Sequence, residues 1–175
     1  MLEWAQDKGM STGLVATSTV THATPASFGA HVDYRKKEAE IAEQFAIADI
    51  DVILGGGKAF WPDSLISIYE NRGGQYISDI NANIDSNKRL LGLFSDNALE
   101  KVHNGRDVST TQMAKLALAN LEKDPDGFFV MIEESQVDWG GHSNSAEYIK
   151  GEMKSLNDLV NFALDYQSIH PEVLV

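Results

Sequence analysis

The sequence predicts an α/β fold in which a largely parallel β-sheet is covered by helices on both faces. Short apolar runs alternate along the chain with longer segments of helical periodicity, which is the pattern of successive strand–helix units. The apolar runs contain few polar residues, as expected for strands that are buried on both faces. Glycine or polar residues follow each run, at the strand ends where such sheets bind ligands.

In the N-terminal half, end signals and apolar periodicity predict four helices and two strands. Gly9 suits the C-cap of the first helix, and Thr24 and Pro25 suit the N-cap and first position of the second. The third helix has Ile41 and Phe45 on one side. The predicted helices cover residues 2–8, 25–32, 38–48 and 65–71, and the predicted strands cover residues 13–18 and 51–54.

Two further apolar runs in the C-terminal half predict buried strands over residues 90–94 and 128–132. The second run follows the segment Asp124–Gly127, whose Asp-Pro-Asp-Gly composition suits a tight turn. Residues 71–88 are polar and lack periodicity, so no element is predicted there.

Two amphipathic helices complete the predicted fold. Ser109 or Thr110 caps a helix that continues to Leu121 and carries an apolar stripe. Residues 145–166 predict a longer helix. Its expected inward face consists of Ile149, Met153, Leu156, Leu159 and Ala163. The whole chain, residues 1–175, is therefore expected to form a single domain.

Composition limits the classes of protein and of site. Hydrophobic residues make up 43% and charged residues 23% of the 175, which is ordinary for a globular protein. The sequence contains no run of about 18 apolar residues, so no membrane span is predicted. The N-terminus also lacks the pattern of a secretion signal. Because the chain has no cysteine, any metal site must use oxygen and imidazole ligands. The net charge of −12 argues against nucleic acid as a partner.

The most informative stretch is Gly127–His142, GFFVMIEESQVDWGGH. After its apolar run come two carboxylates and an imidazole, Glu133, Asp138 and His142. Carboxylate oxygens suit Mg²⁺, and a carboxylate–imidazole pair suits Zn²⁺. The glycines at 140 and 141 predict a loop here rather than a helix. Taken alone, the pattern fits solvated polar side chains equally well.

Two further segments place this stretch in a family. Residues 21–35 read THATPASFGAHVDYR, with Arg35 eleven positions after Thr24, and residues 51–57 read DVILGGG. In order and spacing, the three segments resemble the alkaline phosphatase family. The resemblance implies an alkaline-phosphatase-like α/β fold, incomplete in this chain, and metal-dependent hydrolysis of phosphate monoesters through a covalent phosphoserine.

The resemblance also implies roles for individual residues. It makes Thr24 and Glu133 ligands of Mg²⁺, and Asp138 and His142 ligands of one Zn²⁺. It places Arg35 on the oxygens of the phosphoryl group, which the planar guanidinium can contact in pairs.

Two more residues acquire roles beside the metals. His22 is implied to lie near Mg²⁺ and to reach it through water, and Trp139 is implied to shape the site. Each role has a plainer alternative. Thr24 could serve only as a helix N-cap, and His22 could be an ordinary loop histidine. Arg35 could be a solvated residue of a basic run, and Trp139 could serve only in packing.

The resemblance further implies that part of the active site lies outside these residues. The D-S-A segment that carries the family's nucleophilic serine does not occur, and neither does its later Asp-His zinc segment. The chain is therefore expected to be inactive alone and to have unpaired sheet edges. Glu134 stands where the family usually has glycine, so its carboxylate is expected beside the metal site.

Several alternatives follow from the same sequence. One is a non-catalytic half-domain that binds metal or phosphate. The THATPA segment with Arg35 disfavours a related phosphodiesterase, sulfatase or phosphomutase. A phosphate-binding loop at Gly55–Lys58 is rejected, because Val52 and Ala59 replace the glycine and the hydroxyl residue that it needs.

The resemblance implies a periplasmic or extracellular location and is compatible with a homodimer.

Overall fold

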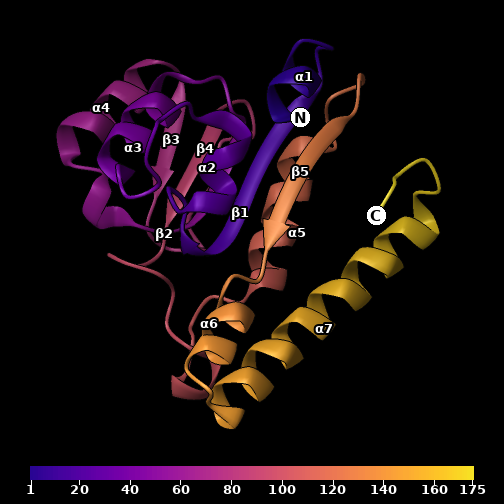
Figure 1. Ribbon diagram of the computed structural model, residues 1–175. Helices are drawn as coiled ribbons and strands as arrows, with labels where there is room; N and C mark the ends of the chain where they lie inside the picture. Colours follow the sequence, from indigo (N-terminus) through magenta and orange to yellow (C-terminus); the bar gives the residue numbers. More distant parts are fainter.

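The computed structural model describes all 175 residues and has a five-stranded sheet at its centre (Figure 1). The strand order is β3-β4-β2-β1-β5, and every neighbouring pair is parallel. The predicted parallel sheet is thus confirmed. The strands are β1 Ser11–Thr19, β2 Val52–Gly56, β3 Gly74–Ile77, β4 Arg89–Leu93 and β5 Phe128–Glu133.

Seven α-helices and two short 3₁₀ helices connect and cover the strands. The α-helices are α1 Leu2–Gln6, α2 Ala23–Gly29, α3 Glu38–Ile47, α4 Asp63–Asn71, α5 Thr110–Leu121, α6 Gln136–His142 and α7 Ala146–Ile169. The 3₁₀ helices are η1 Lys58–Phe60 and η2 Val102–Asn104. None of the helices combines the length and the apolarity needed to cross a membrane.

The central strands bury side chains on both faces, which explains the consecutive apolar residues within them. In β1, Leu14 faces the core formed with α1 to α4, and Val15 faces the core formed with α5. In β2, Ile53 likewise faces the core formed with α1 to α4, and Leu54 faces the core formed with α5. The prediction of helices on both faces is therefore confirmed (Figure 1).

The predicted strand at 128–132 exists but is not buried on both faces. β5 lies at an edge of the sheet and pairs only with β1, so its six residues are all half-buried. An apolar sequence does not distinguish an edge strand from a central one. The open edge agrees with the expectation of an incomplete sheet.

Local differences from the predictions have clear causes. β3, which lies within the unassigned segment 71–88, is only four residues long and is mixed in polarity, so it shows no apolar run. α2 begins at Ala23, because the N–H of Ala26 bonds to the carbonyl oxygen of His22 at 2.9 Å. His22 is therefore the N-cap, and the prediction of Thr24 as the cap is wrong. α2 also ends at Gly29 rather than near Val32.

The last helix packs mainly against other helices. α7 lies over α5 and α6 rather than flat on the sheet (Figure 1). The predicted inward position of Met153 is wrong, since this side chain is 45% exposed. The other four predicted positions are confirmed, since Leu159 is buried and Ile149, Leu156 and Ala163 are half-buried. Tyr148 and Glu152 are also buried, and apolar periodicity does not predict an inward position for a charged residue such as Glu152.

The glycines at residues 55–57 serve close packing. A Cβ atom at Gly56 would lie 2.0 Å from the carbonyl oxygen of Asn97. Gly57 has a φ of +104° and ends β2 before η1. These residues form a strand-to-helix turn, in agreement with the rejection of a phosphate-binding loop.

The core predicts a sharp difference between two residues of α3. Phe45 is fully buried and Ile47 is 58% exposed. Replacement of Phe45 by alanine should lower the free energy of unfolding by about 3–5 kcal/mol through lost burial and a cavity. The matched variant Ile47→Ala should change it by less than about 1 kcal/mol. Urea unfolding followed by circular dichroism measures both values, and equal losses would contradict this packing.

Candidate active site

The segments singled out in the sequence meet where β1 and β5 end. Parallel pairing sets Ala16 of β1 beside Glu133, the last residue of β5. β1 leads into α2, and β5 leads into α6 (Figure 1). The sheet thereby brings residues 16–24 close to residues 133–142. Ligands bind in α/β sheets at this edge.

Glu133 is held in a defined orientation at the end of β5. The hydroxyl of Ser135 donates a hydrogen bond to Oε2 of Glu133 at 2.7 Å. The same Ser135 oxygen accepts the backbone N–H of Ser18 at 3.2 Å. A backbone group of β1 and a buried hydroxyl therefore orient this carboxylate before any ligand binds.

The segment between β1 and α2 is anchored to α3. The hydroxyls of Thr19 and Thr21 both donate to Oε2 of Glu38, at 2.5 and 2.7 Å. Both threonines are buried. This clamp fixes the residues immediately before His22 and Thr24.

His22 lies between two other predicted site residues. Its ring packs edge-on against Trp139 of α6, with 5.6 Å between the ring centroids. Its Nε2 lies 3.5 Å from Nη2 of Arg35. The structure therefore brings His22, Arg35 and Trp139 together. Thr24 lies on the first turn of α2 and is exposed.

Asp138 and His142 lie on a helix, so the prediction of a loop is wrong. They are four residues apart on α6, and Oδ2 of Asp138 lies 3.4 Å from Nε2 of His142. Both side chains are largely exposed, at 71% and 80%. Gly140 has a packing role, since a Cβ atom there would lie 3.1 Å from the backbone nitrogen of Ile149. Glycine here lets α6 approach α7 closely.

The types of donor atom fit the implied metals, but the number of protein ligands is too small for a complete site. The hydroxyl of Thr24 and the carboxylate of Glu133 are oxygen donors of the kind that Mg²⁺ prefers. The Asp138–His142 pair matches Zn²⁺ in type, but protein zinc sites use three or four protein ligands. No three His, Asp or Glu side chains of the chain converge as a metal site.

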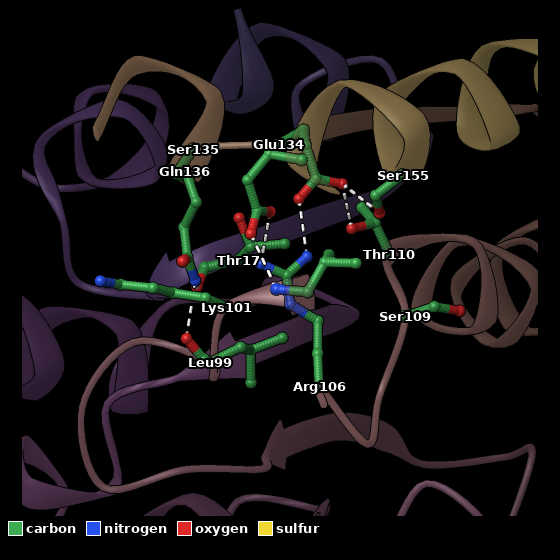
Figure 2. Close-up of polar contacts among 12 residues, drawn as sticks. Thr17, Leu99, Lys101, Arg106, Ser109, Thr110, Glu134, Ser135, Gln136 and Ser155 are labelled. Carbon is green, nitrogen blue, oxygen red and sulfur yellow. Dashed lines mark hydrogen bonds and ion pairs between the residues drawn. The ribbon is translucent and has the colours of Figure 1, made fainter. Parts of the chain in front are cut away.

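Glu134 does not lie beside the metal ligands, contrary to expectation. Its side chain is 1% exposed and points into a buried polar cluster (Figure 2). There it contacts Nη1 of Arg106 at 2.8 Å, and it accepts hydrogen bonds from Thr110 and from Ser155, the latter at 2.9 Å. Arg106 also contacts Glu152 at 2.6 Å. Nothing in the sequence pattern indicated this cluster, because Arg106 lies 28 positions from Glu134 and 46 positions from Glu152.

A polar cavity lies at the other end of the sheet. It has a volume of about 360 Å³ and is lined by polar residues such as Ser11, Asp51, Arg89 and Asp124. Ser11 and Arg89 are the first residues of β1 and β4. This cavity is therefore separate from the candidate active site.

The alkaline phosphatase family model matches residues 1–175, the whole chain. The chain belongs to the alkaline phosphatase family. It is similar to alkaline phosphatase 3 of Bacillus subtilis (strain 168), with 38% identity covering 100% of this chain and 40% of that protein. The repressible alkaline phosphatase of Saccharomyces cerevisiae is 32% identical, over 95% of this chain and 36% of the yeast protein.

Solved alkaline phosphatase structures share the fold. The enzyme from the Antarctic bacterium TAB5 superposes with a TM-score of 0.90 and 32% identity, over 97% of this chain and 52% of that chain. A variant of the TAB5 enzyme, with the same TM-score, has Mg bound in its M3 site. The chain thus spans about two fifths of the length of its curated family members and about half of these solved chains.

The buried cluster predicts a pH dependence of stability. Burial raises the pKa of Glu152 above its ordinary value of 4.5, against the opposing effects of the Val102 N–H and Arg106. The folded chain then keeps a proton that the unfolded chain has released. Stability from this group should therefore fall as the pH rises from about 4.5 through the raised pKa.

Replacement of Glu152 by glutamine tests this prediction. In the variant, the free energy of unfolding should no longer contain the fall with rising pH that Glu152 contributes. Urea titration between pH 4 and 8 measures this free energy. Glu147→Gln, which changes an exposed carboxylate of the same helix, should leave the wild-type profile unchanged. Parallel profiles for wild type and Glu152→Gln would contradict the prediction.

Proposed function

We propose that this chain forms part of the active site of an alkaline phosphatase that hydrolyses phosphate monoesters. One observation carries the proposal. The fold brings residues 22–35 and 133–142 to one end of the sheet, where His22 contacts both Arg35 and Trp139. We also propose that residues 1–175 are a single partial domain of that enzyme.

Arg35 is the residue proposed to bind the phosphoryl group. Its guanidinium is exposed, and it forms no ion pair with a carboxylate of the chain. A guanidinium without a carboxylate partner can donate two parallel hydrogen bonds to phosphoryl oxygens. Such local positive charge is needed because the net charge of −12 repels an anionic substrate.

The remaining residues are proposed as metal ligands. Thr24 and Glu133 would hold Mg²⁺, with His22 close by, and Asp138 and His142 would hold one Zn²⁺. When bound, these ions would neutralise the phosphoryl charge and activate a nucleophile. Ser135 keeps the Glu133 carboxylate oriented through its 2.7 Å hydrogen bond. Trp139 supports the ring of His22 and so shapes the site.

We propose that a serine outside these 175 residues is the nucleophile. In the first step its oxygen bonds to phosphorus as the bond to the alcohol leaving group breaks. Water then displaces the serine and releases phosphate. The 175-residue chain alone is therefore proposed to be inactive. A periplasmic or extracellular location, and a homodimer, remain proposals that rest on the family resemblance.

A second candidate function is a non-catalytic half-domain that binds metal or phosphate. The observation that favours it is the exposed guanidinium of Arg35, which can bind phosphate in a chain whose potential metal ligands do not converge in threes. The two proposals differ in whether the coding sequence supplies the D-S-A and Asp-His segments.

The deciding experiment is a phosphatase assay of two proteins. We expect the 175-residue chain to show no hydrolysis of p-nitrophenyl phosphate. The uninterrupted reading frame around it, expressed with Zn²⁺ and Mg²⁺, should be active and should lose activity after EDTA treatment. Re-addition of Zn²⁺ and Mg²⁺ should restore it. An inactive complete reading frame that still binds these ions would support the half-domain instead.

Arg35 offers a second test in the same active protein. Arg35→Ala should lower kcat/KM for p-nitrophenyl phosphate by about 10–100-fold, because a charge-assisted pair of hydrogen bonds is lost. Inorganic phosphate should also become a weaker competitive inhibitor. The control Lys36→Ala, an exposed cation next to Arg35, should change kcat/KM by less than about threefold. Equal effects of the two variants would show only a general loss of positive charge.

A further inference from the structure

The turn between β5 and α6 is anchored by several side-chain hydrogen bonds. It consists of Glu134 and Ser135 between the last residue of β5, Glu133, and the first of α6, Gln136. All four residues have polar side chains, and the last three are buried. Each of the four makes at least one hydrogen bond to a side chain or carbonyl group in the chain.

The carboxylate of Glu134 holds this turn through contacts with Arg106, Thr110 and Ser155 (Figure 2). Its Oε1 contacts Nη1 of Arg106 at 2.8 Å. Its Oε2 accepts the hydroxyl of Thr110, at the start of α5, and that of Ser155, in α7, at 2.9 Å. One carboxylate therefore ties the turn to two helices and to the loop that carries Arg106.

Arg106 is itself fixed, so its contact with Glu134 is a rigid one. Its side chain is 3% exposed. Its Nε donates to the carbonyl oxygen of Glu100 at 2.6 Å, and its Nη2 contacts Glu152 at 2.6 Å. Glu152 also accepts the backbone N–H of Val102 at 2.9 Å. A guanidinium with this many partners has little freedom to follow a displaced carboxylate.

The two residues after Glu134 hold the turn from the β1 side. Ser135 bonds to Ser18 and to the Glu133 carboxylate. The amide of Gln136 donates to the carbonyl oxygens of Leu99 and Thr17, at 2.6 and 3.2 Å. Tyr148 of α7 donates to Gln136 at 2.7 Å. The turn is thus held on both sides, and Glu133 lies one residue from the Glu134 anchor.

We propose that Glu134 is a positioning residue that holds the β5–α6 turn, and with it Glu133, Asp138 and His142, in place before any metal binds. The assignment of those three residues as metal ligands rests on the proposed function. The anchoring of the turn rests only on the contacts of Glu134. Loss of its charge weakens three bonds at once, and the residue to move first is its neighbour, Glu133.

The chain offers a matched control for this proposal. Glu152 binds the same Arg106, is equally buried, and changes by the same charge when replaced by glutamine, but it lies on α7, away from the turn. Glu134→Gln and Glu152→Gln should therefore perturb Arg106 alike. Only Glu134→Gln should loosen residues 133–142.

Hydrogen–deuterium exchange of the metal-free 175-residue chain tests the proposal directly. In Glu134→Gln, the peptide covering residues 133–142 should exchange about tenfold faster relative to the central strands β1 and β2. In Glu152→Gln, the same ratio should remain within about twofold of wild type. Equal acceleration in both variants, or in neither, would overturn the proposal. If Glu134→Gln does not fold, Ser155→Ala removes one of the three bonds and should give the same localised change, and its absence would also overturn the proposal.

A titration with Mg²⁺ links the turn to ligand binding. The Mg²⁺ concentration that half-protects residues 133–142 from exchange should rise at least about tenfold in Glu134→Gln and remain unchanged in Glu152→Gln. An equal rise in both variants would overturn the proposal. If Mg²⁺ does not change the hydrogen exchange of residues 133–142 in the wild-type chain, this result would count against the proposed metal site in this chain. The exchange ratio of the metal-free chain would still decide the role of Glu134.

Discussion

Six residue pairs join β1 to β5 in parallel, from Ser11 beside Phe128 to Ala16 beside Glu133. The candidate site depends on this pairing, because it connects two segments that are more than a hundred residues apart in the chain. A parallel sheet places the carboxyl ends of its strands at one edge, so the residues that follow β1 and β5 must meet there. The contact of His22 with Trp139 and the bond from Ser18 to Ser135 are both consequences of this register.

The anchors of the site are buried, whereas its proposed ligands are exposed, apart from the half-buried Glu133. Thr19, Thr21, Glu134, Ser135 and Gln136 are all buried, whereas Thr24, Arg35, Asp138 and His142 are exposed. Rigid buried contacts therefore position side chains that remain free to meet a phosphate group or a metal ion. Preorganisation of this kind lowers the cost of ordering the ligands on binding.

The cluster around Arg106 has an energetic cost as well as a structural role. Two carboxylates share one guanidinium in an environment almost free of solvent, and burial of such charges is expensive. The hydrogen bonds from Thr110, Ser155 and the Val102 N–H offset part of that cost. Removal of one partner from a buried ion pair typically costs about 3–5 kcal/mol, so the cluster strongly disfavours any other packing of α5, α7 and the turn.

Local patterns in the sequence determined most of the secondary structure and the identity of the site segments. Apolar runs predicted four of the five strands, and the capping signal at Ser109 or Thr110 located the start of α5. The motif spacing around Thr24, Arg35 and Glu133 indicated the family. Only the tertiary structure decided that β5 is an edge strand, that Asp138 and His142 lie on a helix, and that Glu134 points away from the site. These features depend on tertiary contacts, such as that of Gly140 with Ile149 across a helix junction and that of Glu134 with Arg106, and such contacts leave no periodic pattern in the sequence.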